Sequence, residues 1–266
     1  GLAITRHGEW PFDKLIYVVG NEQIYHFKVL FYIMKLLGYD WYTGLYHLAY
    51  GMVNLPEGKM KSREGTVVDA DDLLNNLRDE ALQEITAKGR EEAVGNPQDV
   101  AEKVALAAVH YFLLQVSPFK DMIFNPKESL SFNGNTGPYL QYMGARMCSV
   151  LAKAEKEGLT GAHLRPQENF EKACALLQSD AEWDLIKLIG SFPRVLQKAS
   201  EALDSASIAG YAYDTAKAFG KFYHDCPIVN ADNADCAAAR LTLTCAVLTV
   251  LKNALNLILV PFLEVM

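Results

Sequence analysis

The sequence predicts a mainly α-helical protein in which a short α/β segment precedes a helical bundle, and two observations support this. Residues 14–20, KLIYVVG, are a short apolar run, rich in β-branched residues and ended by glycine, which is typical of a buried parallel strand. From residue 69 onward, apolar residues recur at three- and four-residue spacing, which is the pattern of amphipathic helices. We expect the boundary between the two parts near residues 126–137.

The α/β segment is expected to contain one strand–helix–strand unit. Its helix covers EQIYHFKVLFYIMKLLG, residues 22–38, with apolar residues on one face and a glycine as a stop signal. The second strand is HLAYGMVNL, residues 47–55. This order is typical of a doubly wound sheet. Because such a sheet needs more strands than two, we expect the segment to be the last part of a larger fold.

Loops rich in glycine, asparagine, aspartate or proline separate the helices that we expect in the rest of the chain. Asp69, Asp71 and Asp72 lie at the start of the first of them, where carboxylates complement the helix dipole, so we interpret them as capping groups rather than metal ligands. The predicted helices cover residues 69–89, 99–116, 138–157, 166–178, 181–203, 207–224 and 233–260.

The composition restricts the possible partners and metal sites. The formal net charge is −7, so a nucleic acid would have to bind a local basic patch, because the whole molecule repels it. The five cysteines form no CxxC pair and lie in apolar stretches, which predicts reduced, buried thiols. The six histidines never pair with cysteines at ligand spacing, so no metal site is predicted. The cysteines are Cys148, Cys174, Cys226, Cys236 and Cys245.

One segment, residues 241–263, is long and apolar enough to span a bilayer. Lys252, Asn253 and Asn256 lie in the middle of it, and a lysine at the centre of a membrane helix is costly. We therefore expect a buried core helix and no membrane partner. The first residues lack the hydrophobic region of a signal peptide, so we expect a cytoplasmic protein.

The loop GKMKSREG, residues 58–65, is the first candidate functional segment. Lys59, Lys61 and Arg63 lie between two glycines that free the backbone, just after the second strand. The carboxyl edge of an α/β sheet is where ligands bind, and such a cationic loop could stabilise the charge that develops on a departing pyrophosphate. A solvated basic loop is the alternative. The sequence is not a GxxxxGK[ST] phosphate loop, and no GxGxxG follows the first strand.

The segment PYLQYMGAR is the second candidate. Tyr139, Tyr142 and Arg146 follow one another at three- and four-residue steps, which puts them on one face of a helix. Aromatic rings and an arginine on one face can stack against unpaired bases. Ordinary helix packing with tyrosine hydroxyls at the surface is the alternative.

Several blocks in order along the chain resemble one known family. GKMKSREG resembles the KMSKS loop of class I aminoacyl-tRNA synthetases. Its context resembles arginyl-tRNA synthetases in particular: IYVVGNEQIYHFKVLFYIMKLLGYDW, then YGMVNLPEGKMKSREGTVVDADDLL, then SFNGNTGPYLQYMGARMCSVL. YAYDTAKAFGKFYHDCPIV and the last methionine also fit. The blocks extend from residue 14 to residue 266, and their order and spacing are more specific than the loop alone.

The resemblance implies a fold, an activity and partners. Residues 1–128 would be the end of a Rossmann-type α/β catalytic domain with the KMSKS-like loop and stem-contact helices, and 129–266 an all-α helical-bundle anticodon-binding domain. The activity would be that of an arginine–tRNA ligase, which forms arginyl-adenylate from arginine and ATP and transfers the arginyl group to its tRNA. Mg²⁺ would accompany ATP. We expect no tightly bound metal, and a monomer.

The resemblance also implies residue roles. The second lysine of KMSKS falls on Ser62 here, while Lys61 occupies the position before it, so the role of Lys61 is open. For the last aromatic position, Tyr211 and Tyr213 compete with Tyr223. The implied catalytic residues are Lys59, Lys61, Ser62 and Arg63; those near ATP are His26, Gly51, Met52 and Met60; Gln23 is near arginine; and those for tRNA are Tyr139, Tyr142, Arg146, Tyr223 and Met266.

One family signature does not occur in these residues. The His-Ile-Gly-His pattern is absent, as are the family's tyrosine and aspartate for the arginine side chain. We therefore expect the chain to match the C-terminal half of the enzyme, and to form no adenylate and charge no tRNA alone. Two alternatives stay open at this point: a non-catalytic tRNA- or RNA-binding module built from the same domains, and an unrelated nucleotide-binding α/β protein with a helical appendage.

Overall fold

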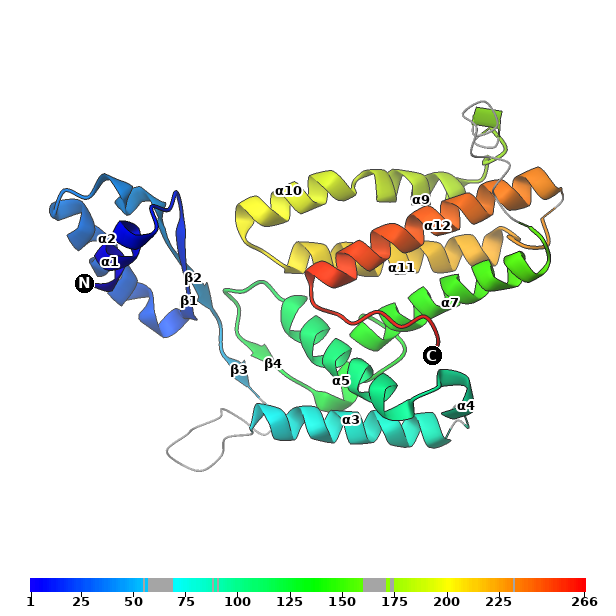
Figure 1. Cartoon of the computed structure of the whole chain (residues 1–266), viewed down its shortest axis with the longest axis horizontal. Helices are drawn as coiled ribbons and strands as arrows, with labels where there is room; N and C mark the ends of the chain where they lie inside the picture. The colour runs from blue at the N-terminus through cyan, green and yellow to red at the C-terminus, as the bar shows by residue number, and fades with distance from the viewer. Residues whose placement is uncertain are drawn as a thin grey trace. The chain divides into compact units, whose positions relative to one another are not determined.

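The computed structural model of the protein is mainly helical, with small parallel sheets near the N-terminus, which confirms the predicted fold class (Figure 1). It describes residues 1–54, 56, 69–87, 89, 91–159, 171–172, 175–231 and 233–266. The chain divides into two units. Unit 1 comprises Gly1–Lys59 and Val116–Ile123, and unit 2 comprises Met60–Gln115 and Phe124–Met266.

Unit 1 contains two short parallel strand pairs. Strand β1 pairs with β2, with Leu15 opposite Leu45 and Gly20 opposite Tyr50, and β3 pairs with β4. A crossover through a helix is the usual connection between parallel strands, and α2 provides it here. The elements are α1 (Leu2–Glu9), β1 (Leu15–Gly20), a 3₁₀ helix (Asn21–Gln23), α2 (Ile24–Leu36), a second 3₁₀ helix (Asp40–Gly44), β2 (Leu45–Tyr50), β3 (Val53–Asn54) and β4 (Met122–Ile123).

Helix α2 covers one face of the β1–β2 sheet. Tyr17 on β1 packs against Phe27 and Phe31 of α2, with ring centroids 5.0 and 6.0 Å apart. The alternate β1 residues point to the other face, where Ile16 is 37% and Val18 is 63% exposed. The prediction that residues 14–20 are a buried strand is therefore wrong for this face, because no described element covers it. The predicted strand over 47–55 is divided into β2 and β3.

Unit 2 is helical and holds the larger apolar core. Helices α7, α11 and α12 lie side by side, and α9 and α10 lie along α11 (Figure 1). Helices α3 and α5 pack against each other around a second, smaller apolar cluster. The elements are α3 (Ala70–Ala87), α4 (Glu91–Val94), α5 (Pro97–Leu114), α6 (Pro126–Ser129), α7 (Gly137–Lys156), α9 (Asp180–Gly190), α10 (Phe192–Ala202), α11 (Ala206–Asp225) and α12 (Ala234–Leu257).

The predicted helix boundaries differ from the structure at several places. The helix expected over 181–203 is two helices, because Pro193 lies in the first turn of α10 and cannot donate a hydrogen bond to the preceding turn. The helix expected over 166–178 falls mostly outside the described residues, and residues 175–178 are turn and coil rather than helix. Helix α5 begins two residues before the prediction, because Asn96 caps it and Pro97 occupies its first position.

Helix α12 is long and apolar enough to cross a membrane by length and composition alone. In the structure, half of that apolar window is buried, and α12 packs against α7, α9 and α11. The segment therefore packs as a core helix, which agrees with the interpretation from its sequence.

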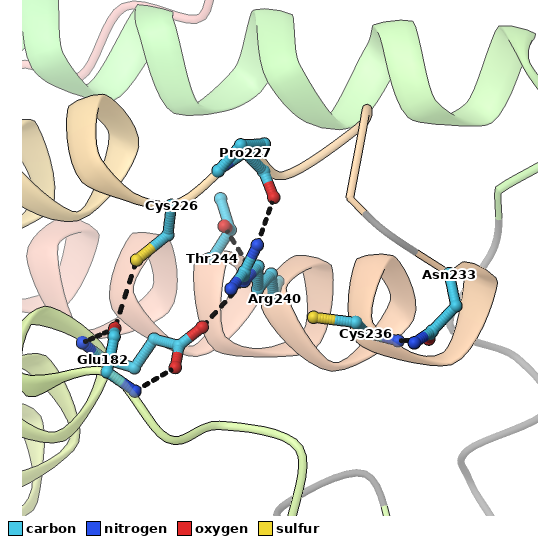
Figure 2. Close-up of polar contacts among 8 residues, drawn as sticks. Glu182, Cys226, Pro227, Asn233, Cys236, Arg240 and Thr244 are labelled. Atoms are coloured by element: carbon cyan, nitrogen blue, oxygen red, sulfur yellow. Dashed lines mark hydrogen bonds and ion pairs between the residues drawn. The ribbon is translucent and has the colours of Figure 1, made fainter.

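A buried ion pair ties α9 to α12 (Figure 2). Glu182 accepts a hydrogen bond from Nε of Arg240 at 2.6 Å and another from the backbone N–H of Ser179 at 2.8 Å. Arg240 also donates to the carbonyl of Pro227 at 2.7 Å, so it reaches the loop between α11 and α12. Burial alone would raise the pKa of Glu182, but these hydrogen bonds and the charge of Arg240 outweigh it and lower the pKa below its ordinary value.

No disulfide joins cysteines among the described residues, and the burial of these cysteines differs. Cys226 and Cys236 are buried, as predicted, and Cys148 is half-buried. Cys245 is exposed, so the prediction of a buried thiol is wrong there, because its position on α12 faces away from the core. Cys174 lies outside the described residues.

Candidate functional site

The first candidate site lies at the carboxyl end of β1 and β2 in unit 1. Gly20 ends β1, and Asn21–Gln23 then forms a 3₁₀ turn that leads directly into α2. The side chains of Gln23 and His26 are exposed in this turn and in the first turn of α2. Both residues therefore lie at the carboxyl edge of the β1–β2 sheet, and the roles that the resemblance implies for them stay predictions.

The end of β2 is held by a segment that is distant in the sequence. The backbone N–H of Gly51 donates to the carbonyl of Pro118 at 2.7 Å. The next N–H, that of Met52, donates to the carboxylate of Asp121 at 2.7 Å. The same Asp121 oxygen accepts from the amide of Asn21 at 3.4 Å. Asp121 therefore joins the turn after β1 to the end of β2.

Gly51 is required by this close approach. A Cβ atom at position 51 would clash with the carbonyl of Lys120 and with the N–H of Asp121, and both of these are backbone groups. The main chain of residues 51 and 52 therefore passes directly against residues 118–122, while the Met52 side chain stays 42% exposed. We call Asn21, Gly51, Met52 and Asp121 the sheet corner.

The sequence gives no signal for Asp121. No element is predicted over SPFKDMIF, because two-residue strands such as β4 give no periodic signal. The predicted residues of the cationic loop lie outside the described residues. They are Lys59, Met60, Lys61, Ser62 and Arg63.

The second candidate site lies in unit 2, where α7 and α11 present aromatic and cationic side chains. The guanidinium of Arg146 lies 4.3 Å from the ring centroid of Tyr223, which is within the range of a cation–π contact. About two turns earlier on α7, Tyr139 packs against Tyr213 with centroids 5.8 Å apart. Burial raises the pKa of Tyr139, so its hydroxyl stays neutral at physiological pH. We call these four residues the α7–α11 face.

Tyr142 lies beside a cavity rather than on α11. The cavity has a volume of about 290 Å³, and Tyr142 and Met266 both contribute to its wall. Tyr142 is 41% exposed, so its ring is available at the rim. Most of the other lining residues are apolar and come from α3 and α5. They are Ala81, Glu84, Ile85, Val94, Val100, Val104, Phe132 and Asn133.

Met266 is brought to this cavity by the chain after α12. Gln141 on α7 is fully buried and donates to the carbonyl of Pro261 at 2.7 Å and to that of Lys103 on α5 at 3.0 Å. Phe262 packs on Gly144, where a Cβ atom would clash with its ring. The ring also carries Lys252 above it at 4.3 Å. These contacts fix the last residues along α7, with Met266 at the cavity.

The structure thus brings together most of the residues predicted for RNA. Arg146 stacks on Tyr223, which favours Tyr223 over Tyr211, because Tyr211 is buried and donates its hydroxyl to the carbonyl of Leu188. Tyr213, a competitor for the same role, pairs with Tyr139 instead. Among the residues that the structure describes, no group of three or more histidine, cysteine, aspartate or glutamate side chains could hold a metal ion.

Comparison with known protein families gives two matches along the chain. Residues 1–126 match the catalytic domain of class I tRNA synthetases of the arginine type. Residues 140–266 match the DALR anticodon binding domain. The sheet corner lies within the first match, and the α7–α11 face lies within the second apart from Tyr139, which directly precedes it.

Individual proteins agree with these matches. The arginine–tRNA ligase of Treponema denticola is 56% identical over the whole of this chain, and that of Borrelia hermsii is 44% identical over the whole chain. The chain spans 44% of the length of each of these relatives. The arginyl-tRNA synthetase structure of Thermus thermophilus superposes with a TM-score of 0.81 at 26% identity, over 96% of this chain and 41% of that one. The chain belongs to the arginyl-tRNA synthetase family, in which it corresponds to the end of the catalytic domain followed by the DALR anticodon-binding domain.

Proposed function

We propose that this chain supplies part of the nucleotide site and the tRNA-binding helical domain of an arginine–tRNA ligase. In that reaction, arginine and ATP give arginyl-adenylate and pyrophosphate, and the arginyl group then passes to the terminal ribose of the tRNA for arginine. The observation that carries the proposal is the α7–α11 face, where Arg146 lies over Tyr223, together with the exposed ring of Tyr142 four residues before Arg146 on α7. Stacked aromatic and guanidinium groups are what unpaired bases bind.

Tyr142 and Met266 place an unstacked base in the adjoining cavity in this proposal. A base has apolar faces and a polar edge, and the cavity has apolar walls with two polar side chains, Glu84 and Asn133. Its volume of about 290 Å³ is at the small end for ligand pockets, which suits one base rather than a larger ligand.

In this proposal, the sheet corner forms part of the site that binds ATP. His26 and the backbone of Gly51 and Met52 would lie near ATP, Gln23 near arginine, and Met60 near ATP on the cationic loop. Lys59, Lys61, Ser62 and Arg63 would act on the phosphates, where cationic and hydroxyl groups stabilise the charge that develops in the transition state. Mg²⁺ would arrive with ATP, held by its phosphates. The position of the corner at the carboxyl end of parallel strands supports this assignment.

The family matches at 1–126 and 140–266 support a functional division into residues 1–128 on the catalytic side and 129–266 on the anticodon side. Because the chain spans 44% of its relatives' length, we assign the whole reaction to a complete catalytic domain rather than to these residues alone. We further propose a cytoplasmic monomer.

A binding experiment tests the RNA side. Fluorescence anisotropy with labelled tRNA for arginine should show binding to the unaltered chain, and Tyr142→Ala should weaken it by about tenfold, since stacking of one base contributes about 1–3 kcal/mol. Tyr32→Ala, which removes an exposed ring from α2 in unit 1, is the matched control and should leave the affinity unchanged. Equal affinities for the Tyr142→Ala variant and the unaltered chain would mean that Tyr142 has no part in RNA binding.

The catalytic side has a separate test. Arginine-dependent exchange of pyrophosphate into ATP should be absent for this chain alone. Exchange above background would contradict the assignment of the activity to a larger catalytic domain.

A further inference from the structure

A second cavity adjoins the one that contains Tyr142 and Met266. It has a volume of about 440 Å³ and lies between α3, α6 and the turn that precedes α7. Glu84, Phe132 and Asn133 line both cavities, so these three residues form the wall between them. The residues found in the second cavity alone are Glu80, Lys127, Leu130 and Ser131.

We propose that this second cavity is a subsite for the nucleotide that neighbours the one bound beside Tyr142 and Met266. The inference rests on the proposed function, because it extends the RNA path from the first cavity across Phe132. Two adjoining cavities suit two consecutive nucleotides, with one base in each cavity. No residue of this second cavity, apart from the shared wall, is used by the proposed anticodon site.

Lys127 supplies the positive charge that a phosphate group needs. It is exposed on α6, and it forms no ion pair with any of the described residues. The backbone phosphate between the two nucleotides would therefore be bound on the Lys127 side of the cavity. A lysine that neutralises one phosphate releases a counterion, which makes RNA binding depend more steeply on salt.

Glu80 and Glu84, one helical turn apart on α3, contribute carboxylates to the lining of this cavity. Carboxylates repel phosphate but accept hydrogen bonds from the amino groups of bases, as glutamate does from cytosine N4. Uracil presents a carbonyl oxygen where cytosine has its amino group, so a carboxylate disfavours it. The subsite should therefore prefer a base with an amino group, such as cytosine or adenine, over uracil.

The turn that carries the shared wall is held by its own hydrogen bonds. Ser131 Oγ donates to the carbonyl of Asn133 at 2.9 Å and accepts from the N–H of Asn133 at 3.2 Å. Thr136, which caps α7, donates its hydroxyl to the carbonyl of Ser131. The position of Asn133 is thus fixed relative to the start of α7, so both cavities keep a defined wall before RNA arrives.

The experiment measures binding of a labelled RNA stem–loop that copies the anticodon arm of a tRNA for arginine, at several salt concentrations. Lys127→Met should weaken binding by about threefold to tenfold and reduce the slope of log K against log salt by about 0.7, the value for one phosphate on a single strand. Lys153→Met removes an exposed lysine of α7 outside both cavities and is the matched control. It should change neither the affinity nor the slope.

A second arm tests the carboxylates. In Glu80→Gln, discrimination between stem–loops that carry cytosine or uracil at the neighbouring position should fall about fivefold to tenfold, because the amide can also donate to the uracil carbonyl. If Lys127→Met behaves like Lys153→Met while Tyr142→Ala still weakens binding, the subsite is wrong and the proposed RNA site stands. If the unaltered chain binds no stem–loop at all, the proposed function fails and the subsite fails with it.

Discussion

The sheet corner of unit 1 and the α7–α11 face of unit 2 are both candidate sites, and different forces hold them in place. The corner is built from backbone groups and one exposed carboxylate, that of Asp121, which connect short segments. The α7–α11 face stands on two long helices whose inner sides lie in the large apolar core. The corner therefore depends on a few polar contacts, whereas the face depends on the stability of the whole bundle.

This difference has a functional meaning. A site on short connecting segments can change shape when a ligand binds, because few contacts oppose the movement. A site on packed helices is fixed before the ligand arrives, so less ordering opposes binding. We expect the nucleotide side of the protein to adjust on binding and the RNA side to be preformed, and the following predictions test that expectation.

The largest effect on stability is expected for Arg240→Met, which removes the ion pair between α9 and α12 in the helical bundle of unit 2. Glu182 would stay buried with a charge that only the Ser179 cap satisfies, and breaking one partner of a buried pair costs about 3–5 kcal/mol. Chemical denaturation followed by circular dichroism measures the loss in unit 2. Hydrogen exchange at the Met52 amide should change little, because this contact belongs to unit 1.

The double variant Arg240→Met, Glu182→Gln is the control for that interpretation. Without the charge on either side, most of the stability should return, because replacing both partners of a buried pair is far less costly than removing one. A double variant as unstable as Arg240→Met would show that packing around Arg240, rather than the unpaired carboxylate, carries the effect.

Gly51→Ala should break the corner and leave the bundle intact. The added Cβ would meet the backbone of Lys120 and Asp121, and backbone cannot move aside as a flexible side chain can, so we expect a local cost of about 1–3 kcal/mol. Hydrogen exchange at the amides of Met52 and Met122 should become faster. Gly20→Ala is the matched control, because its Cβ would make only an ordinary contact with the Tyr50 ring at 3.9 Å.

The two regions also differ in how much of each could be predicted from the sequence. Periodicity identified the helices of unit 2 and the positions of Tyr139, Tyr142 and Arg146 on α7, because helix spacing is a local property. It could not show that Arg146 lies over the Tyr223 ring or that Tyr139 packs against Tyr213, since those pairs depend on how α7 and α11 pack.

The corner was less predictable, because its key contact is not local. Asp121 and the Met52 amide are 69 residues apart, and the two-residue strand beside Asp121 leaves no pattern in the sequence. The turn with Gln23 and His26 directly follows a strand and opens a helix, so its place is set by local sequence. The prediction that both faces of β1 are buried was wrong for one face, because a β-branched run does not reveal whether a second layer covers the strand.

Acid should weaken the bundle by protonating Glu182. The pKa of Glu182 lies below its ordinary value of 4.5, because the Ser179 hydrogen bonds and Arg240 outweigh the effect of burial. The stabilisation is therefore complete above pH 4.5 and is lost as the pH falls through the lowered value. Denaturation midpoints measured between neutral pH and pH 3 should fall more for the unaltered chain than for Arg240→Met, which has already lost the ion pair. Parallel curves would show that other carboxylates dominate the acid response.

The smallest change in stability is expected for Arg146→Met. This variant separates the contribution of Arg146 to RNA binding from its contribution to the stability of the bundle. The contact with Tyr223 is exposed to solvent on one side, so its loss should cost only about 0.5–1 kcal/mol of unfolding free energy. RNA affinity should fall further than that, because the variant loses both a stacking plane and a charge that attracts phosphate. Arg146→Lys keeps the charge without the planar group and should recover the salt dependence but only part of the affinity. Equal losses of stability and affinity in Arg146→Met would mean that the face is not preformed, and the contrast with the sheet corner would then disappear.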